Sequence, residues 1–186
     1  ICKQLVDQGA NVILNDIDEA LTRKAARSIT EDQTRCLPFP GDASDIAFIH
    51  TLVSESINKF GKLSIAIANA GITLFGGFFE YKPEDFNKVM SLNLGGSFFL
   101  AQAASLAMKK SKTPGSILLM SSVTGHQAHK NLAAYGMTKA ALEMLAKTLV
   151  LELSPIQITI NAIAPGATLT ERTASDPEFE ATWSRI

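Results

Sequence analysis

Short apolar runs alternate along the chain with longer segments in which apolar residues recur every three or four positions. A short apolar run bounded by turn residues is typical of a strand that is buried on both faces. Recurrence at three and four positions is typical of a helix that packs one face on a core. The pattern predicts strands over residues 11–16, 34–42, 63–70, 116–121 and 156–164, and helices over residues 19–29, 44–60, 83–110 and 132–153.

Strands that are apolar on both faces and alternate with helices indicate a parallel sheet with helices on both sides. This is the doubly wound, three-layer α/β/α arrangement. The length of 186 residues suits one domain, and the sequence contains no long Pro/Gly linker, internal repeat or low-complexity tract. We therefore expect a single domain over residues 1–186, with ligands bound at the carboxyl ends of the strands.

Composition narrows the classes of function. Apolar residues make up 46% of the chain, and 17 Lys and Arg residues against 18 Asp and Glu residues leave a net charge of −1. That balance argues against a nucleic-acid binder, and the absence of an apolar run of 18 residues predicts no membrane-spanning helix. Cys2 and Cys36 lack metal-ligand spacing, so we expect reduced thiols, no metal site and a cytoplasmic location.

Polar and turn residues follow the predicted strands. Asp16 ends the first strand, where a carboxylate accepts hydrogen bonds from a dinucleotide's ribose; a helix cap is the alternative. Asp42 ends the second strand, placed to cap the next helix or to contact an adenine amino group. The third strand ends in Asn69-Ala70-Gly71 and the fifth in Pro165-Gly166, which suit tight turns or close approach to a ligand.

The fourth strand and the helix after it carry the sharpest signal. Ser122 ends the strand, Tyr135 lies 13 residues later, and Lys139 lies four residues beyond Tyr135. Residues four apart share one face of a helix, so the phenol and the ammonium are expected to be neighbours. Taken alone, the Tyr-Lys pair is equally compatible with an ordinary helix surface.

The combination of Ser-Ser, Y-x-x-x-K, N-A-G and P-G at these positions resembles the short-chain dehydrogenase/reductase family. Asn93, in an Asn-Leu-Gly stretch of the long helix 83–110, adds to the resemblance, which runs from residue 1 to about residue 172. It implies a Rossmann-type fold and a catalytic tetrad of Asn93, Ser122, Tyr135 and Lys139. Ser122 would hold the substrate oxygen and Tyr135 would exchange a proton with it. Lys139 would bind the nicotinamide ribose and lower the pKa of the tyrosine, and Asn93 would anchor a water of the proton relay.

The resemblance also implies how a nicotinamide cofactor is held. Asp16 would select NAD over NADP, because its carboxylate repels a 2′-phosphate and the next residue is Ile17 rather than Arg. The cofactor contacts implied are Asp16, Ile17, Asp42, Ala43, Asn69, Ala70, Gly71, Tyr135, Lys139, Pro165, Gly166, Thr168 and Thr170.

The resemblance further suggests a substrate region after Ser122, with Thr124, His126 and His129 as candidates and a solvated loop as the alternative for the histidines. A secondary alcohol or ketone would be the substrate. A sugar or polyol of the glucose 1-dehydrogenase type is favoured over the substrates of 3-oxoacyl-carrier-protein reductases and hydroxysteroid dehydrogenases. A non-catalytic, cofactor-sensing protein is the alternative from another class. Helices 83–110 and 132–153, the latter apolar on two sides, suggest a homodimer or homotetramer.

The chain departs from the family pattern at both ends. The opening strand and its T-G-x-x-x-G-x-G phosphate loop would lie before Ile1, and the closing strand would lie after Ile186. We therefore expect the sequence to be truncated at both ends relative to the family.

Overall fold

The strands of the computed structural model, which describes residues 1–174, form two parallel groups. Strand β1 (Val12–Leu14) pairs with β2 (Cys36–Pro38), and a second group has the order β3 (Ile65–Ala68), β4 (Gly115–Met120) and β5 (Ile158–Ile163). Every pairing is parallel, with Ala68 opposite Leu119 and Met120 opposite Ile163. The expected α/β class with parallel strands is confirmed.

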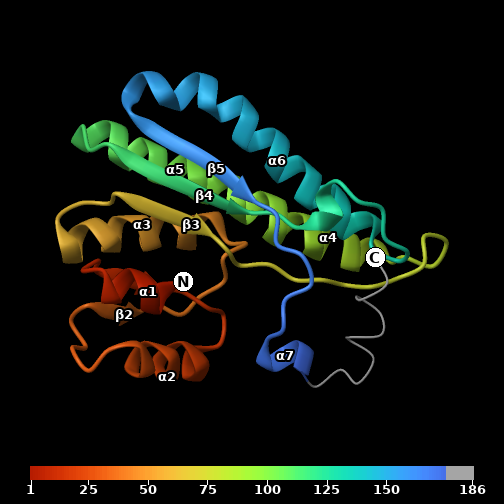
Figure 1. Cartoon of the computed structure of the whole chain (residues 1–186), viewed down its shortest axis with the longest axis horizontal. Coiled ribbons are helices and arrows are strands. Elements are labelled where there is room, and N and C mark those ends of the chain that lie inside the picture. The colour runs from red at the N-terminus through yellow and green to blue at the C-terminus, as the bar shows by residue number, and fades with distance from the viewer. Residues whose placement is uncertain (175–186) are drawn as a thin grey trace.

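Helices connect and cover these strands (Figure 1). Helices α1 (Cys2–Asp7) and α2 (Glu19–Ile29) pack on β1 and β2. Helix α3 (Ile46–Phe60) packs on α5 (Ser97–Ser111), α5 packs on β3 and β4, and α6 (Ala133–Leu153) packs on β4 and β5. The remaining helical elements are α4 (Pro83–Val89), α7 (Glu171–Ala174), the π-helical stretch Met90–Gly96, and the 3₁₀ turns Val123–Gly125 and Ser154–Ile156.

The observed strands are shorter than the apolar runs that predicted them. The run 34–42 yields only Cys36–Pro38 as a strand, although the Phe39 and Gly41 amides still donate to the Leu14 and Asp16 carbonyls beyond the end of that strand. The short helix α7 was not expected from the sequence pattern. The predicted order of strands and helices is retained throughout.

The caps of α2 and α3 correct one reading of the two strand-end aspartates. Asp18 caps α2 and accepts a hydrogen bond from the Leu21 amide. Asp45 caps α3 and accepts a hydrogen bond from the Ala47 amide. Asp16 and Asp42 lie two and three residues earlier, so neither is the cap residue of the helix that follows. The alternative that assigned these two carboxylates to helix capping is wrong.

Helices α4 and α5 form one continuous helical segment, Pro83–Ser111, through the π-helical stretch between them. By length and composition alone this segment could cross a membrane, which the sequence pattern did not predict. Its residues Ala101, Ala104 and Met108 are fully buried in the core cluster formed with β3, β4, β5 and α6. Packing inside an α/β domain therefore explains the apolar residues on its buried side.

Helix α6 has two apolar faces. Leu142 and Ala146 lie in the core cluster against the sheet. Met137, Met144 and Leu151, spaced by seven residues, are exposed on another side of the helix. The first face is explained by the sheet, and the second has no covering element among residues 1–174.

Candidate active site

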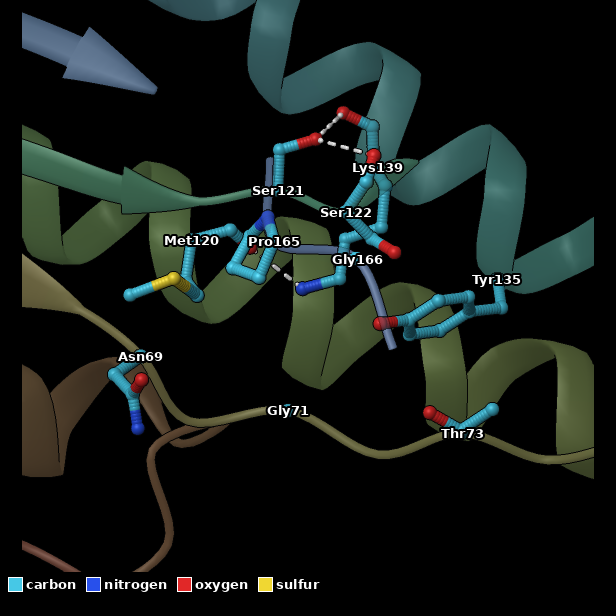
Figure 2. A pocket seen from close by; sticks show the side chains of 10 residues that line it. All are labelled: Asn69, Gly71, Thr73, Met120, Ser121, Ser122, Tyr135, Lys139, Pro165 and Gly166. Atoms are coloured by element: carbon cyan, nitrogen blue, oxygen red, sulfur yellow. Dashed lines mark hydrogen bonds between the residues drawn. The ribbon is translucent and has the colours of Figure 1, made fainter. Parts of the chain in front are cut away.

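A cavity of about 200 Å³ lies where β3, β4 and β5 end and α6 begins (Figure 2). This is the edge at which parallel α/β sheets bind their ligands. The cavity is lined by Asn69, Gly71, Thr73, Met120, Ser121, Ser122, Tyr135, Lys139, Pro165 and Gly166. Three strand ends and one helix predicted from the sequence to carry the chemistry therefore meet in a single place.

Lys139 enters this cavity from inside the protein. The residue is 5% exposed, and its Nζ donates a hydrogen bond of 2.7 Å to the carbonyl oxygen of Met120, at the end of β4. Burial lowers the pKa of Lys139 from 10.5 to about 8, because the charged ammonium loses hydration. The ammonium has three hydrogens, so two remain for other acceptors.

Tyr135 and Ser122 face the same space. The Lys139 Nζ atom lies 5.4 Å from the centre of the Tyr135 ring, as their spacing on one helix face predicts. Figure 2 shows the Tyr135 hydroxyl directed into the cavity. The Ser122 hydroxyl accepts a 3.3 Å hydrogen bond from the Thr124 amide, which fixes its orientation at the start of the 3₁₀ turn. The loop after β5 is tied to this segment, since the Val123 amide donates to the Pro165 carbonyl at 3.0 Å.

Asn93 lies behind the cavity wall rather than on it. The residue is fully buried in the π-helical stretch, and its carboxamide pairs with the backbone amide and carbonyl of Ile72, each at 2.9 Å. A Cβ atom placed on Gly71 would lie 3.2 Å from Asn93 Oδ1 and 3.7 Å from Lys139 Nζ. Glycine at position 71 thus lets the chain pass directly between the Asn93 amide and the Lys139 ammonium.

The residues expected to hold the adenosine lie at the ends of β1 and β2. The Gly41 amide donates to the Asp16 carbonyl at 3.0 Å, and Asn15 joins the same two strand ends by donating to Phe39 and Gly41. Asp16 is exposed, and its Oδ1 accepts a hydrogen bond from the Asp18 amide at 3.0 Å. One carboxylate oxygen therefore stays available at this edge.

The other expected cofactor contacts are distributed unevenly. Asn69, Gly71, Pro165 and Gly166 line the cavity. The Asp42 carboxylate accepts hydrogen bonds from the amide and the hydroxyl of Ser44. The side chain of Ile17, next to Asp16 in the sequence, is 72% exposed. Ala70, Thr168 and Thr170 do not line the cavity: Ala70 is exposed between two lining positions, Thr168 donates to the Gly166 carbonyl, and Thr170 contacts Thr173.

Of the residues suggested for substrate binding, Ser122 alone lines the cavity. Thr124 is buried, with no hydrogen-bond partner for Oγ1 in the described structure. The His126 ring turns toward Glu143, with Nδ1 3.2 Å from Oε1, and lines a separate cavity beside β5. The His129 Nε2 atom is buried outside the active-site cavity.

Sequence reasoning missed several residues of this region. Thr73 and Ser121 line the cavity, and Glu143 binds Ser121 from α6. An acidic residue among the apolar positions of α6, four residues after Lys139, was the available signal for Glu143. Within residues 1–174 no group of three His, Cys, Asp or Glu side chains is placed to hold a metal ion.

The sequence is similar to a known protein family and to characterised members of it. A family model described as short chain dehydrogenase matches residues 1–181. The (S)-acetoin-forming diacetyl reductase of Staphylococcus epidermidis is 31% identical over 171 residues, which are 92% of this chain. The chain spans 66% of that relative's length, just under two thirds.

Two solved structures have the same architecture. A gluconate 5-dehydrogenase from Burkholderia cenocepacia, in complex with NADP and tartrate, superimposes with a TM-score of 0.87 at 27% identity, covering 97% of this chain and 72% of that one. A xylitol dehydrogenase bound to NAD⁺ gives the same TM-score of 0.87 at 27% identity, covering 97% and 68%. The first structure holds NADP and the second holds NAD⁺.

Proposed function

Since this chain belongs to the short-chain dehydrogenase/reductase family, we propose that the protein is an oxidoreductase that transfers a hydride between NAD and a secondary alcohol or ketone. One observation carries this proposal. The Tyr135 phenol, the Ser122 hydroxyl and the buried Lys139 ammonium surround one cavity at the carboxyl ends of three parallel strands.

The residues present fit a dinucleotide. After its bond to the Met120 carbonyl, Lys139 has two hydrogens left, which suit two ribose hydroxyls. Gly71 and Gly166 expose backbone on the cavity wall, and Asp16 offers a carboxylate at the neighbouring strand end. When bound, the nicotinamide supplies the hydride chemistry, and the protein supplies positions and protons.

The roles of the side chains follow from the chemistry of the reaction. In the direction of reduction the substrate oxygen gains negative charge, and the Ser122 hydroxyl would donate a hydrogen bond to it. The Tyr135 hydroxyl gives its proton to the same oxygen and takes it back in oxidation. The nearby Lys139 ammonium favours negative charge on the phenol oxygen as the proton leaves. At an effective dielectric of about 20, a positive charge roughly 5 Å away contributes on the order of 3 kcal/mol.

NAD is the proposed cofactor because of Asp16. A carboxylate beside the adenosine ribose accepts hydrogen bonds from both hydroxyls and repels a 2′-phosphate. The cations nearest in sequence, Arg23 and Lys24, lie on α2, and Arg23 pairs with Glu19 at 2.8 Å. The two similar structures hold one cofactor each, NADP in the gluconate 5-dehydrogenase and NAD⁺ in the xylitol dehydrogenase, so the proposal of NAD rests on Asp16.

The Asp16 variant tests the cofactor. We expect the wild type to favour NAD over NADP by about tenfold or more in kcat/KM, equivalent to about 1.4 kcal/mol for each factor of ten. Asp16→Ala should remove most of this preference. Glu19→Ala, which changes the net charge equally on α2, should keep it. Equal use of both cofactors by the wild type would contradict the assignment and favour the 3-oxoacyl-carrier-protein reductase alternative.

A sugar or polyol is the proposed substrate. The polar cavity wall and the similarity to a xylitol dehydrogenase and a gluconate 5-dehydrogenase support this class. The diacetyl reductase relative keeps a small ketone as the second candidate. Assays of the full natural chain with polyols, sugars, diketones, hydroxysteroids and 3-hydroxyacyl thioesters, followed by NADH absorbance, should show turnover of the first class. Binding of NAD without turnover of any of these substrates would favour the cofactor-sensing alternative.

We further propose a homodimer or homotetramer. Met137, Met144 and Leu151 form an exposed apolar stripe on α6, and Phe98 and Leu106 are exposed on α5. Exposed apolar surface of this kind is typical of a protein interface. A second copy of the chain would bury these side chains. We also propose a cytoplasmic location, as the two predicted reduced cysteines suggest.

A further inference from the structure

The distance between Ser122 and the Tyr135–Lys139 pair depends on the packing of two separate elements. Ser122 belongs to the segment 121–126, which leaves β4 through the 3₁₀ turn Val123–Gly125. Tyr135 and Lys139 belong to α6. Because hydrogen bonding and proton transfer tolerate displacements of only a fraction of an ångström, the contact between the segment and α6 matters for the site.

A single carboxylate oxygen joins the two elements. Glu143 Oε1, on α6, accepts a 2.8 Å hydrogen bond from the Ser121 hydroxyl and lies 3.2 Å from His126 Nδ1. Ser121 directly precedes Ser122, and His126 follows it by four residues. Glu143 thus holds the segment that carries Ser122 at both of its ends.

The same contact reaches the backbone at Lys139. The Ser121 Oγ atom also lies 3.0 Å from the Lys139 carbonyl oxygen, one helical turn before Glu143. A Cβ atom on Gly125 would lie 2.7 Å from Glu143 Oε1 and 3.0 Å from the Lys139 carbonyl carbon. The segment therefore packs directly on α6, and glycine at position 125 leaves the space that the carboxylate occupies.

The surroundings favour a charged carboxylate. Ser121 is 3% exposed, and the Glu143 side chain is 24% exposed. Partial burial acts to raise the pKa of Glu143, but hydrogen bonds from Ser121 and His126, with the charges of His126 and Lys147, hold it below its ordinary value. Glu143 and His126 line a second cavity, separate from the active-site cavity. The β5 residues that line this second cavity are Ile160, Asn161 and Ala162, which carry no charge.

We propose that Glu143 is a positioning residue, which fixes Ser122 relative to Tyr135 and Lys139 by holding the segment 121–126 on α6 through Ser121 and His126. This inference rests on the proposed dehydrogenase function and extends it to a residue outside the cavity wall. A hydrogen bond to a carboxylate in a partly dry site is stronger than one between neutral groups, so this contact holds the segment more firmly than ordinary loop packing.

Kinetics of the full natural chain provide the first test. Glu143→Ala should lower kcat by roughly ten- to a hundredfold, the size expected for a misplacement on the order of 1 Å. The KM for NAD should change less than kcat, because Glu143 bonds to Ser121 and His126, which are not expected cofactor contacts, and reaches Pro165 only indirectly through Val123. Glu143→Gln, which keeps an oxygen acceptor, should recover most of the loss. Glu152→Ala, on an exposed position of the same helix, should behave as the wild type.

A double variant shows whether Ser121 and Glu143 act as one unit. Ser121→Ala should lose a similar factor in kcat, and the double variant Ser121→Ala/Glu143→Ala should lose little more than either single variant. Multiplicative losses, or equal losses in kcat and cofactor affinity with a large fall in Tm, would overturn the positioning role.

Hydrogen exchange separates this inference from the proposed function. The amides of Val123, Gly125 and His126 are hydrogen-bonded within the segment or to Pro165. Glu143→Ala should speed their exchange and leave α3 unchanged, whereas Glu152→Ala should alter neither. If the wild type turns over no alcohol but this local effect is seen, the proposed function fails and the contact stands. Unchanged exchange in Glu143→Ala refutes the inference whatever the activity.

Discussion

At the scale of single residues, Lys139 carries a positive charge in the protein interior, where the loss of hydration destabilises it. Its ammonium is buried and donates a hydrogen bond to the Met120 carbonyl. A lowering of its pKa from 10.5 to about 8 corresponds to roughly 3 kcal/mol, at about 1.36 kcal/mol for each pKa unit. The site is therefore less stable than an apolar filling of the same space would be, as expected where a buried charge serves chemistry.

Lys139→Met should raise Tm at pH 7, because it removes the buried charge. The unfolded chain protonates this lysine below pH 10.5 and the folded chain only below about pH 8. The penalty is therefore complete below pH 8 and disappears as the pH rises toward 10.5. Thermal melts should show a smaller gain at pH 9.5 than at pH 7, and Lys147→Met, at an exposed position of α6, should show neither effect. A gain of equal size at both pH values would contradict the lowered pKa.

Tyr135→Phe should lose about 10² to 10⁴ in kcat, the range for removal of a positioned acid or base. The ring fills almost the same space, so the Kd for NAD should stay close to that of the wild type. Tyr81→Phe is the matched control, since the Tyr81 hydroxyl donates to the Leu74 carbonyl away from the cavity. Retention of a tenth or more of the activity by Tyr135→Phe would exclude the proposed proton transfer.

At the scale of elements, the sequence predicted more of the order than of the contacts. Alternating apolar runs were enough to place every strand and every long helix, and Y-x-x-x-K was enough to place Tyr135 beside Lys139. The π-helical stretch around Asn93 was not predictable, because one extra residue per turn leaves no mark on a short apolar pattern. The turn of His126 toward Glu143 depends on packing between residues 17 apart, which periodicity does not report.

The π-helical stretch Met90–Gly96 also contacts a loop that we propose to bind adenine. The Gly96 backbone faces the Ala43 carbonyl so closely that a Cβ atom there would overlap it. Ala43 belongs to the loop that begins with Asp42, a proposed adenine contact. Glycine at position 96 thus lets the helix support that loop by direct backbone contact.

Gly96→Ala should displace this loop. We expect a loss of about 1–3 kcal/mol in the free energy of unfolding, as for other overpacked sites, together with weaker NAD binding. Gly95→Ala is the matched control, because a Cβ atom there would make only an ordinary 3.7 Å contact with the Met90 carbonyl. Calorimetric titration with NAD and thermal melts measure both effects. Equal behaviour of the two variants would show that the contact with Ala43 is unimportant.

At the scale of the whole molecule, the proposed active site and the proposed oligomer interface lie on different faces of α6. Tyr135 and Lys139 face the cavity and Leu142 faces the sheet, whereas Met144 is 60% exposed and Leu151 is 77% exposed. A helix that carries catalytic groups is held more rigidly when both of its apolar faces are covered. The proposed oligomer would therefore stabilise the site without contributing a residue to it.

Met144→Glu should shift the full natural chain toward a smaller species in light scattering at micromolar concentration, because a carboxylate would be buried without a partner in the interface. Leu21→Glu, at a similarly exposed apolar position on α2, should leave the mass unchanged. A monomeric wild type would refute the assembly.

The bond from Lys139 to the Met120 carbonyl has a consequence for mutational robustness. The acceptor is a main-chain atom, so replacing the Met120 side chain does not delete it, and sequence drift at that position is harmless to the lysine. The position of the Met120 carbonyl is set by the hydrogen-bond register of β4 with β3 and β5. A slip of that register would turn the carbonyl away, and it would move the core-facing side chains of β4 at the same time. A change of side chain at position 120 that leaves the β4 backbone in place therefore keeps the lysine's acceptor.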